Sequence, residues 1–181
     1  MKKSILFESL FKWKFVNFSS KEEYINVDGF FCQAFGPRKN NPGFSNQFLA
    51  GCIIQEYKKN PKPLIIQKEC ADAFPSNIKI DKIISKHEVY GKYLDSFEVS
   101  RQCYEYCKKN NLKTLLVFAH PDHIWRVVKT LEKIGFNNIV VADTRGTPYD
   151  WHSIQIWTKA KFIFLLREFF VRLLYLFKKK I

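Results

Sequence analysis

Short apolar runs alternate with segments of helical spacing through the middle of the chain, and this order strongly constrains the fold. The apolar runs occupy residues 27–36, 63–67, 78–85, 114–119 and 138–142. Between them, apolar residues recur every three or four positions over residues 46–59, 97–110 and 122–134. Parallel strands that are joined by helical crossovers produce such an order. The sequence therefore predicts an α/β fold of the doubly wound, Rossmann-like kind, with a mainly parallel sheet and helices on both faces.

No long linker divides the 181 residues, so we expect one domain with a core over residues 27–158 and a C-terminal helical segment over residues 159–181. A hydrophobic fraction of 46% suffices for a core and argues against disorder.

Residues 1–26 carry apolar residues at helical spacing, and we expect this segment to dock on the body of the protein. Charged residues interrupt it before the apolar core of a signal peptide develops. Five cysteines without a C-x-x-C pair fit reduced thiols, which favours a cytoplasmic location.

Basic residues outnumber acidic ones by 30 to 17, which gives a formal net charge of +13. Most of the excess lies at the two ends of the chain. Residues 159–181 contain seven basic residues and one acidic residue, and residues 1–17 contain four and one. This charge attracts phosphate-rich partners, either nucleic acid or an anionic membrane surface. Because the aromatic residues lie in apolar runs rather than between basic residues, the sequence disfavours a nucleic-acid interface.

The C-terminal segment admits two interpretations. Residues 162–177 are strongly apolar, but they are too few and too charged to span a bilayer. In the first interpretation the helix packs across the sheet, with Glu168 and Arg172 paired at i,i+4 and with a solvated edge. In the second, the apolar face lies in the headgroup region at the inner face of a membrane, and the three lysines at 178–180 contact anionic lipid.

The densest group of chemically active residues is Ala119-His-Pro-Asp-His-Ile-Trp-Arg126, which directly follows the clearest strand. Ligands bind at the carboxyl ends of strands in such sheets. A helix N-terminus together with Arg126 would hold an anion there, His120 would contact the ligand, and His123 would transfer protons near neutral pH. A purely structural alternative makes Asp122 the helix cap, His120 a loop residue and Arg126 a solvated charge.

A second group precedes the helix over residues 97–110. Asp95 or Ser96 would cap this helix and Glu98 would lie in its first turn, so helix-start signals account for all three residues. In a functional interpretation Asp95 and Ser96 contact the ligand, and Glu98 orients the imidazole of His123 from one strand away. Further candidate contacts for an anion, at the end of the first strand and in the loop and helix start that follow it, are Gly36, Arg38 and Asn46.

Five motifs follow one another over residues 27–181. They are Gly36, Asn46-Gln-Phe-Leu49, Asp95-Ser-Phe-Glu98, His123-Ile-Trp-Arg126, and a stretch from Tyr149-Asp150 through Trp157-Thr158 to Arg167-Glu168. In this order they resemble the YdcF/SanA/ElyC family of domains of unknown function.

That resemblance implies a Rossmann-like domain and a possible S-adenosylmethionine ligand, and it implies a link to envelope or polysaccharide metabolism. Asp95-Ser96 stands where the family has Asn-Thr, and Ala119-His120 stands where it has Thr-Ser. These departures imply either that the ligand preference has shifted or that the site is degenerate.

The segment from Ala119 to His123 also resembles the Ala-His-Pro-Asp-Asp signature of zinc-dependent N-acetylglucosaminyl deacetylases. This second resemblance implies a hydrolase with His87 or His152 as the distant zinc ligand. Here, however, the signature follows the fourth predicted strand rather than the first, and His123 stands at the position of the base. The function that the sequence favours is binding of a small anionic or nucleotide-like ligand around His123, Glu98 and Arg126, and no motif decides whether the site is catalytic.

Overall fold

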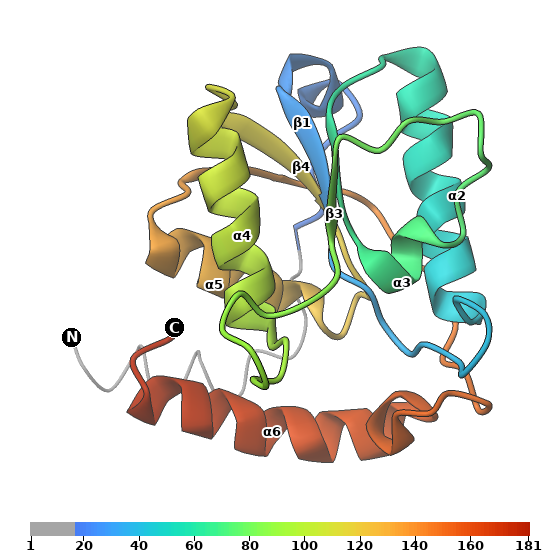
Figure 1. Cartoon of the computed structure of the whole chain (residues 1–181), viewed down its shortest axis with the longest axis vertical. Coiled ribbons are helices and arrows are strands. Elements are labelled where there is room, and N and C mark those ends of the chain that lie inside the picture. The colour runs from blue at the N-terminus through green and yellow to red at the C-terminus, as the bar shows by residue number, and fades with distance from the viewer. Residues whose placement is uncertain (1–16) are drawn as a thin grey trace.

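A computed structural model describes residues 17–181, so most of the predicted N-terminal amphipathic segment lies outside the described residues. Five parallel strands form one sheet in the order β3-β2-β1-β4-β5 (Figure 1). Their bounds are Gly29–Cys32 for β1, Leu64–Gln67 for β2, Lys82–Ile84 for β3, Thr114–Phe118 for β4 and Asn138–Val141 for β5. The predicted α/β class with a parallel sheet is confirmed.

Helices cover both faces of the sheet, as the strand residues require. Phe30 of β1 points toward α2 (Phe44–Lys59) and the short α3 (Lys68–Ala71), and it belongs to the same apolar cluster as Leu49. Phe31 points the other way and packs with Val99 of α4 (Ser96–Lys109) and Val127 of α5 (Ile124–Ile134). Since consecutive side chains of a strand point to opposite faces, both residues are buried in different halves of the core.

The ends of two helices are set by single residues that the sequence identifies. Asp95 is the N-cap of α4, and its carboxylate accepts a hydrogen bond from the Glu98 backbone N–H at 2.9 Å. Gly135 follows α5 with a φ of +108°, the left-handed conformation that glycine adopts readily. The predicted first strand is shorter than expected, because the chain leaves the sheet at Gln33 and the Gln33 side chain donates to Ser96 O and to Ser100 Oγ.

After the short helix η2 (Ile156–Thr158), helix α6 (Lys161–Phe177) crosses the end of the molecule at which the strands terminate (Figure 1). Its buried residues are Phe164, Glu168, Arg172 and Tyr175. The predicted packing and the predicted pair between Glu168 and Arg172 are therefore confirmed, with Arg172 Nε 3.2 Å from Glu168 Oε1.

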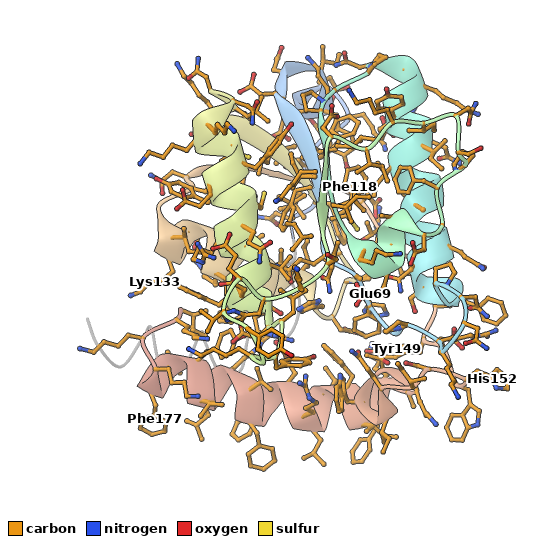
Figure 2. The ribbon with its side chains drawn as sticks, viewed as in Figure 1. Glu69, Phe118, Lys133, Tyr149, His152 and Phe177 are labelled. Atoms are coloured by element: carbon orange, nitrogen blue, oxygen red, sulfur yellow. The ribbon has the colours of Figure 1, made fainter. Side chains whose placement is uncertain are left out.

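The expected solvated edge is reversed, because the charged arc of α6 faces the protein and an apolar arc faces outward. Figure 2 shows side chains projecting from α6 away from the sheet, with Phe177 at one end of the helix. Phe177 is 79% exposed, whereas Glu168 is completely buried. Among residues 17–181, no helix is long and apolar enough to cross a membrane.

Candidate functional site

A cavity of about 240 Å³ lies between the strand ends and α6. The ends of β1 and β2 contribute Gln33 and Gln67, and the start of α4 contributes Asp95 and Ser96. Other polar and aromatic residues of its wall include His123, Arg126, Gln155, Trp157, Arg167 and Tyr175. The carboxyl edge of the sheet is thus the place where side chains of α4, α5 and α6 converge, as expected for a sheet of this kind.

Ser96 connects two of the predicted site residues. Its hydroxyl lies 3.1 Å from His123 Nε2 and accepts a hydrogen bond from Arg126 Nη1 at 2.7 Å. If the Ser96 hydroxyl donates to His123 Nε2 and accepts from Arg126, both hydrogen bonds form with a neutral His123 ring. The structure therefore brings Ser96, His123 and Arg126 together in the cavity wall.

Arg126 also takes part in a buried ionic cluster that the sequence analysis did not foresee. Its Nε lies 3.0 Å from each carboxylate oxygen of Glu168, which also accepts from Arg172. Burial lowers the pKa of Arg126, but the Glu168 carboxylate and Tyr175 together outweigh this effect and the pKa is raised. Arg126 is therefore not a solvated charge. It also does not face the cavity as an unpaired cation, because the Glu168 carboxylate already contacts it.

Both histidines of the Ala119–Arg126 segment are buried and neutral at pH 7. Burial lowers the pKa of His120 to about 4, although nearby Asp122 acts in the opposite direction. Burial and then the Arg126 charge hold the pKa of His123 well below its ordinary value. In the described part of the chain, His120 Nε2 and His123 Nδ1 have no hydrogen-bond partner.

His120 lies in the loop between β4 and α5, as the structural alternative predicted, but it is buried there and does not line the cavity. Its ring stacks on Phe35 with a centroid distance of 4.0 Å, and its Nδ1 accepts a hydrogen bond from the Asp122 backbone N–H. The Asp122 carboxylate does not cap α5; it accepts a hydrogen bond from the Tyr149 hydroxyl at 2.8 Å, and the N-cap position is taken by His123.

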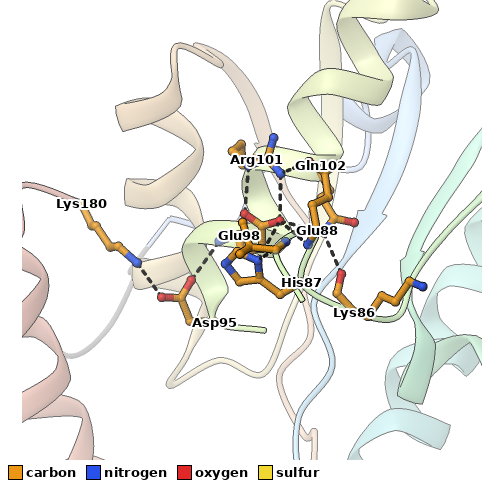
Figure 3. A network of polar contacts seen from close by, with 9 residues as sticks. Lys86, His87, Glu88, Asp95, Glu98, Arg101, Gln102 and Lys180 are labelled. Carbon is orange, nitrogen blue, oxygen red and sulfur yellow. Dashed lines mark hydrogen bonds and ion pairs between the residues drawn. The ribbon is translucent and has the colours of Figure 1, made fainter. Parts of the chain in front are cut away.

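Glu98 does not orient His123, so this prediction is corrected. Figure 3 shows its carboxylate within a separate polar network. Arg101 donates to it at 2.8 and 2.9 Å, and Gln102 donates at 2.9 Å. These contacts, led by the Arg101 hydrogen bonds, lower the pKa of Glu98 to about 2 despite its burial. The physical reason is helical geometry, because residues two positions apart, such as Ser96 and Glu98, lie on different sides of a helix.

Asp95 lies in the cavity wall and is held from two sides. Besides capping α4, its carboxylate accepts a hydrogen bond from Lys180 Nζ at 2.6 Å (Figure 3). Lys180 follows α6, so this ion pair joins the end of α6 to the start of α4. Sequence spacing gave no signal for this contact, because 85 residues separate its partners.

Gly36, Arg38 and Asn46 do not line the cavity; they make internal contacts. Asn46 is fully buried and accepts a hydrogen bond from the Phe35 backbone N–H at 2.8 Å. Arg38 forms a two-point ion pair with Asp150 at 2.8 and 2.9 Å. The side chains of Arg38 and Asn46 thus hold the loop after β1 in place, outside the wall of this cavity.

Arg167 is a cavity residue whose guanidinium makes no ion pair with a described residue, although the Glu168 charge acts on it from farther away. Its guanidinium lies over the Trp157 ring, 4.2 Å from the ring centroid. No carboxylate between residues 17 and 181 forms an ion pair with it. Burial, followed by repulsion from Arg126, lowers the pKa of Arg167. The sequence analysis placed Arg167 in a family motif and on the charged arc of the C-terminal helix but did not identify it as a site residue.

The resemblance to zinc-dependent deacetylases implies that His87 or His152 joins the Ala119–His123 segment in a zinc site. Over the described residues, no three side chains of His, Cys, Asp or Glu are grouped so that they could hold a metal ion. His152 is exposed, and the Nδ1 of His87 accepts a hydrogen bond from the Val89 backbone N–H.

In comparisons of the chain with protein-family models, curated proteins and solved structures, nothing matched.

Proposed function

We propose that this chain binds a small anionic ligand, bearing a phosphate or carboxylate group, in the cavity beneath α6. The observation that carries the proposal is the position of Arg167 in the cavity wall, where an aromatic ring contacts it and no carboxylate of residues 17–181 forms an ion pair with it. A partly buried charge is costly without a counter-ion. An anionic ligand would supply that counter-ion.

The charges around the cavity support the same conclusion. Lys180 balances Asp95, and the single carboxylate of Glu168 contacts both Arg126 and Arg172. The described ionic groups therefore leave an excess of positive charge on the side of the cavity that α6 forms. Ser96 adds a hydroxyl group at the N-terminus of α4, where backbone N–H groups also favour an anion.

The geometry supports binding better than acid–base catalysis. Ser96 and His123 are close enough for a proton to pass between them. However, proton uptake by His123 would create a further cation near Arg126, Arg167 and Arg172, and no carboxylate of residues 17–181 forms an ion pair with the ring to offset it. His123 therefore serves in this proposal as a neutral hydrogen-bonding group of the site.

The size of the cavity favours a compact ligand. Its volume of about 240 Å³ lies below the roughly 300–1,000 Å³ that is common for drug-sized ligands. A sugar phosphate suits this volume better than a dinucleotide. The S-adenosylmethionine ligand, the link to envelope or polysaccharide metabolism and the family assignment stay predictions from resemblance, as does the cytoplasmic location.

A thermal-shift panel tests the proposal. The probes are inorganic phosphate, glucose 6-phosphate, AMP and S-adenosylmethionine, applied to the wild type, to Arg167→Met and to the surface control Arg145→Met. We expect at least one anionic probe to raise the melting temperature of the wild type and of Arg145→Met but not that of Arg167→Met. Absence of a shift across the panel, or an equal shift in Arg167→Met, would contradict an anion site at Arg167.

A further inference from the structure

The outer face of α6 is an apolar surface that the described part of the chain leaves uncovered. Phe162, Leu166 and Phe170 are 78%, 55% and 60% exposed, and Leu174 and Phe177 continue the same row. At about 100° per residue, this row is centred opposite the buried face that contains Phe164 and Glu168. Contiguous exposed apolar surface of this kind marks an interaction site or a membrane-binding site.

The charges of α6 identify the kind of partner that fits this surface. Glu168 is the only acidic residue of α6, and it is fully buried against Arg126 and Arg172. The exposed charges at the two ends of the helix are all basic, with Lys161 at its start and Lys178 and Lys179 after its last turn. The outward side of α6 thus presents large apolar side chains between positive ends.

We infer that α6 docks on an anionic lipid bilayer, with its outer row in the interfacial region and the flanking lysines against the headgroups. Aromatic and leucine side chains on one face and lysines at its borders are the composition of helices that lie in a membrane surface. The lysines add electrostatic attraction to anionic lipids. Trp151, Ile154 and Ile156, in the segment that leads to α6, are exposed as well.

Charge complementarity favours a lipid bilayer as the partner of this surface over a second copy of the chain or residues 1–16. A second copy of α6 packed face to face would bring basic helix ends together in either direction. Residues 1–16 contain four lysines and one glutamate, so they too would meet charge of the same sign. An anionic bilayer instead offers charge of the opposite sign along the whole helix.

Cosedimentation with lipid vesicles tests this inference on the full chain. The vesicles are phosphatidylcholine alone and phosphatidylcholine mixed with phosphatidylglycerol. We expect the wild type to sediment with the mixed vesicles and much less with the neutral ones, and we expect added salt to weaken the binding. Failure to bind the mixed vesicles, or equal binding to both kinds, would overturn the inference.

Matched variants locate the binding surface. Phe170→Ser should weaken partitioning at least several-fold, whereas Ile25→Ser, at a residue of similar exposure in η1 (Glu23–Asn26), should leave it unchanged. The double variant Lys178→Glu with Lys179→Glu should also weaken it, unlike Lys108→Glu with Lys109→Glu at the far end of α4. Circular dichroism and thermal unfolding verify that each variant is folded.

Two further outcomes would contradict docking of α6 on a bilayer. If Phe170→Ser and the wild type bind the mixed vesicles equally, another surface such as residues 1–16 carries the binding and the inference is wrong. If light scattering shows a wild-type dimer that Phe170→Ser dissociates, the outer face is a contact between copies and the inference is likewise wrong. Phe170 does not line the cavity, so the two proposals succeed or fail separately.

Discussion

Arg126 of α5 and Glu168 of α6 form a buried ion pair in which Arg126 Nε lies 3.0 Å from each carboxylate oxygen. The pair fastens the last helix to the α/β core and places Arg167, the preceding residue, at the cavity. This ion pair therefore holds α6 where Arg167 can form part of the cavity wall.

Removal of the Glu168 charge should destabilise the protein strongly. Glu168→Gln leaves the buried guanidinium groups of Arg126 and Arg172 without their shared carboxylate, and loss of one partner of a buried pair costs about 3–5 kcal/mol. Urea unfolding measures the change. The control is Glu132→Gln, whose exposed pair with Lys129 is worth less than about 1 kcal/mol. Similar losses in the two variants would show that the Glu168 cluster does not hold α6.

The ion pair between Asp150 and Arg38 should stabilise the loop after β1, as the Glu168 cluster stabilises the position of α6. Its completely buried carboxylate accepts two hydrogen bonds from Arg38, one from the Phe44 backbone N–H and one from that of His152. Asp150→Asn should lower the free energy of unfolding by about 3 kcal/mol, because it leaves Arg38 unpaired. Asp143→Asn, which breaks the exposed pair with Arg145, is the matched control, and an equally small effect of both substitutions would refute this role of Asp150.

The depressed pKa of His120 predicts a loss of stability in acid. Between about pH 6.5 and pH 4 the unfolded chain binds a proton that the folded protein does not accept, so stability is complete above this range and falls as pH decreases through it. His120→Phe keeps an aromatic ring against Phe35 and removes the titrating group. Relative to the wild type, this variant should lose about 3 kcal/mol less on acidification, measured by urea unfolding across the range. His123 acts in the same direction in both proteins, so parallel curves would contradict the assignment to His120.

The alternation of apolar runs and helical segments was sufficient to predict the parallel sheet, because burial of both sheet faces leaves few other solutions. The cap at Asp95 and the left-handed Gly135 were likewise predictable, since their determinants are local in sequence. The orientation of α6 was not predictable from its own residues. Its charged arc turns inward because Arg126, 42 positions earlier, needs a carboxylate in the core.

Part of the candidate site could be predicted and part could not. Spacing within one segment brought His123 and Arg126 to the sheet edge, and both line the cavity. The role given to Glu98 was wrong, because nearness in sequence to Ser96 does not place it on the same side of α4. Arg167 was not identified as a site residue, because its importance depends on its having no ion pair with a carboxylate among the described residues, which only the folded arrangement reveals.

The central claim, that the cavity beneath α6 holds an anion at Arg167, is tested most directly by isothermal titration calorimetry with the panel compound that stabilises the protein most. Loss of a charge-assisted contact of about 1.5–3 kcal/mol weakens binding roughly 10- to 100-fold. We predict a loss of at least about tenfold for Arg167→Met and wild-type affinity for Arg145→Met. Equal affinity of the wild type and Arg167→Met, or no binding by the wild type, would contradict the account.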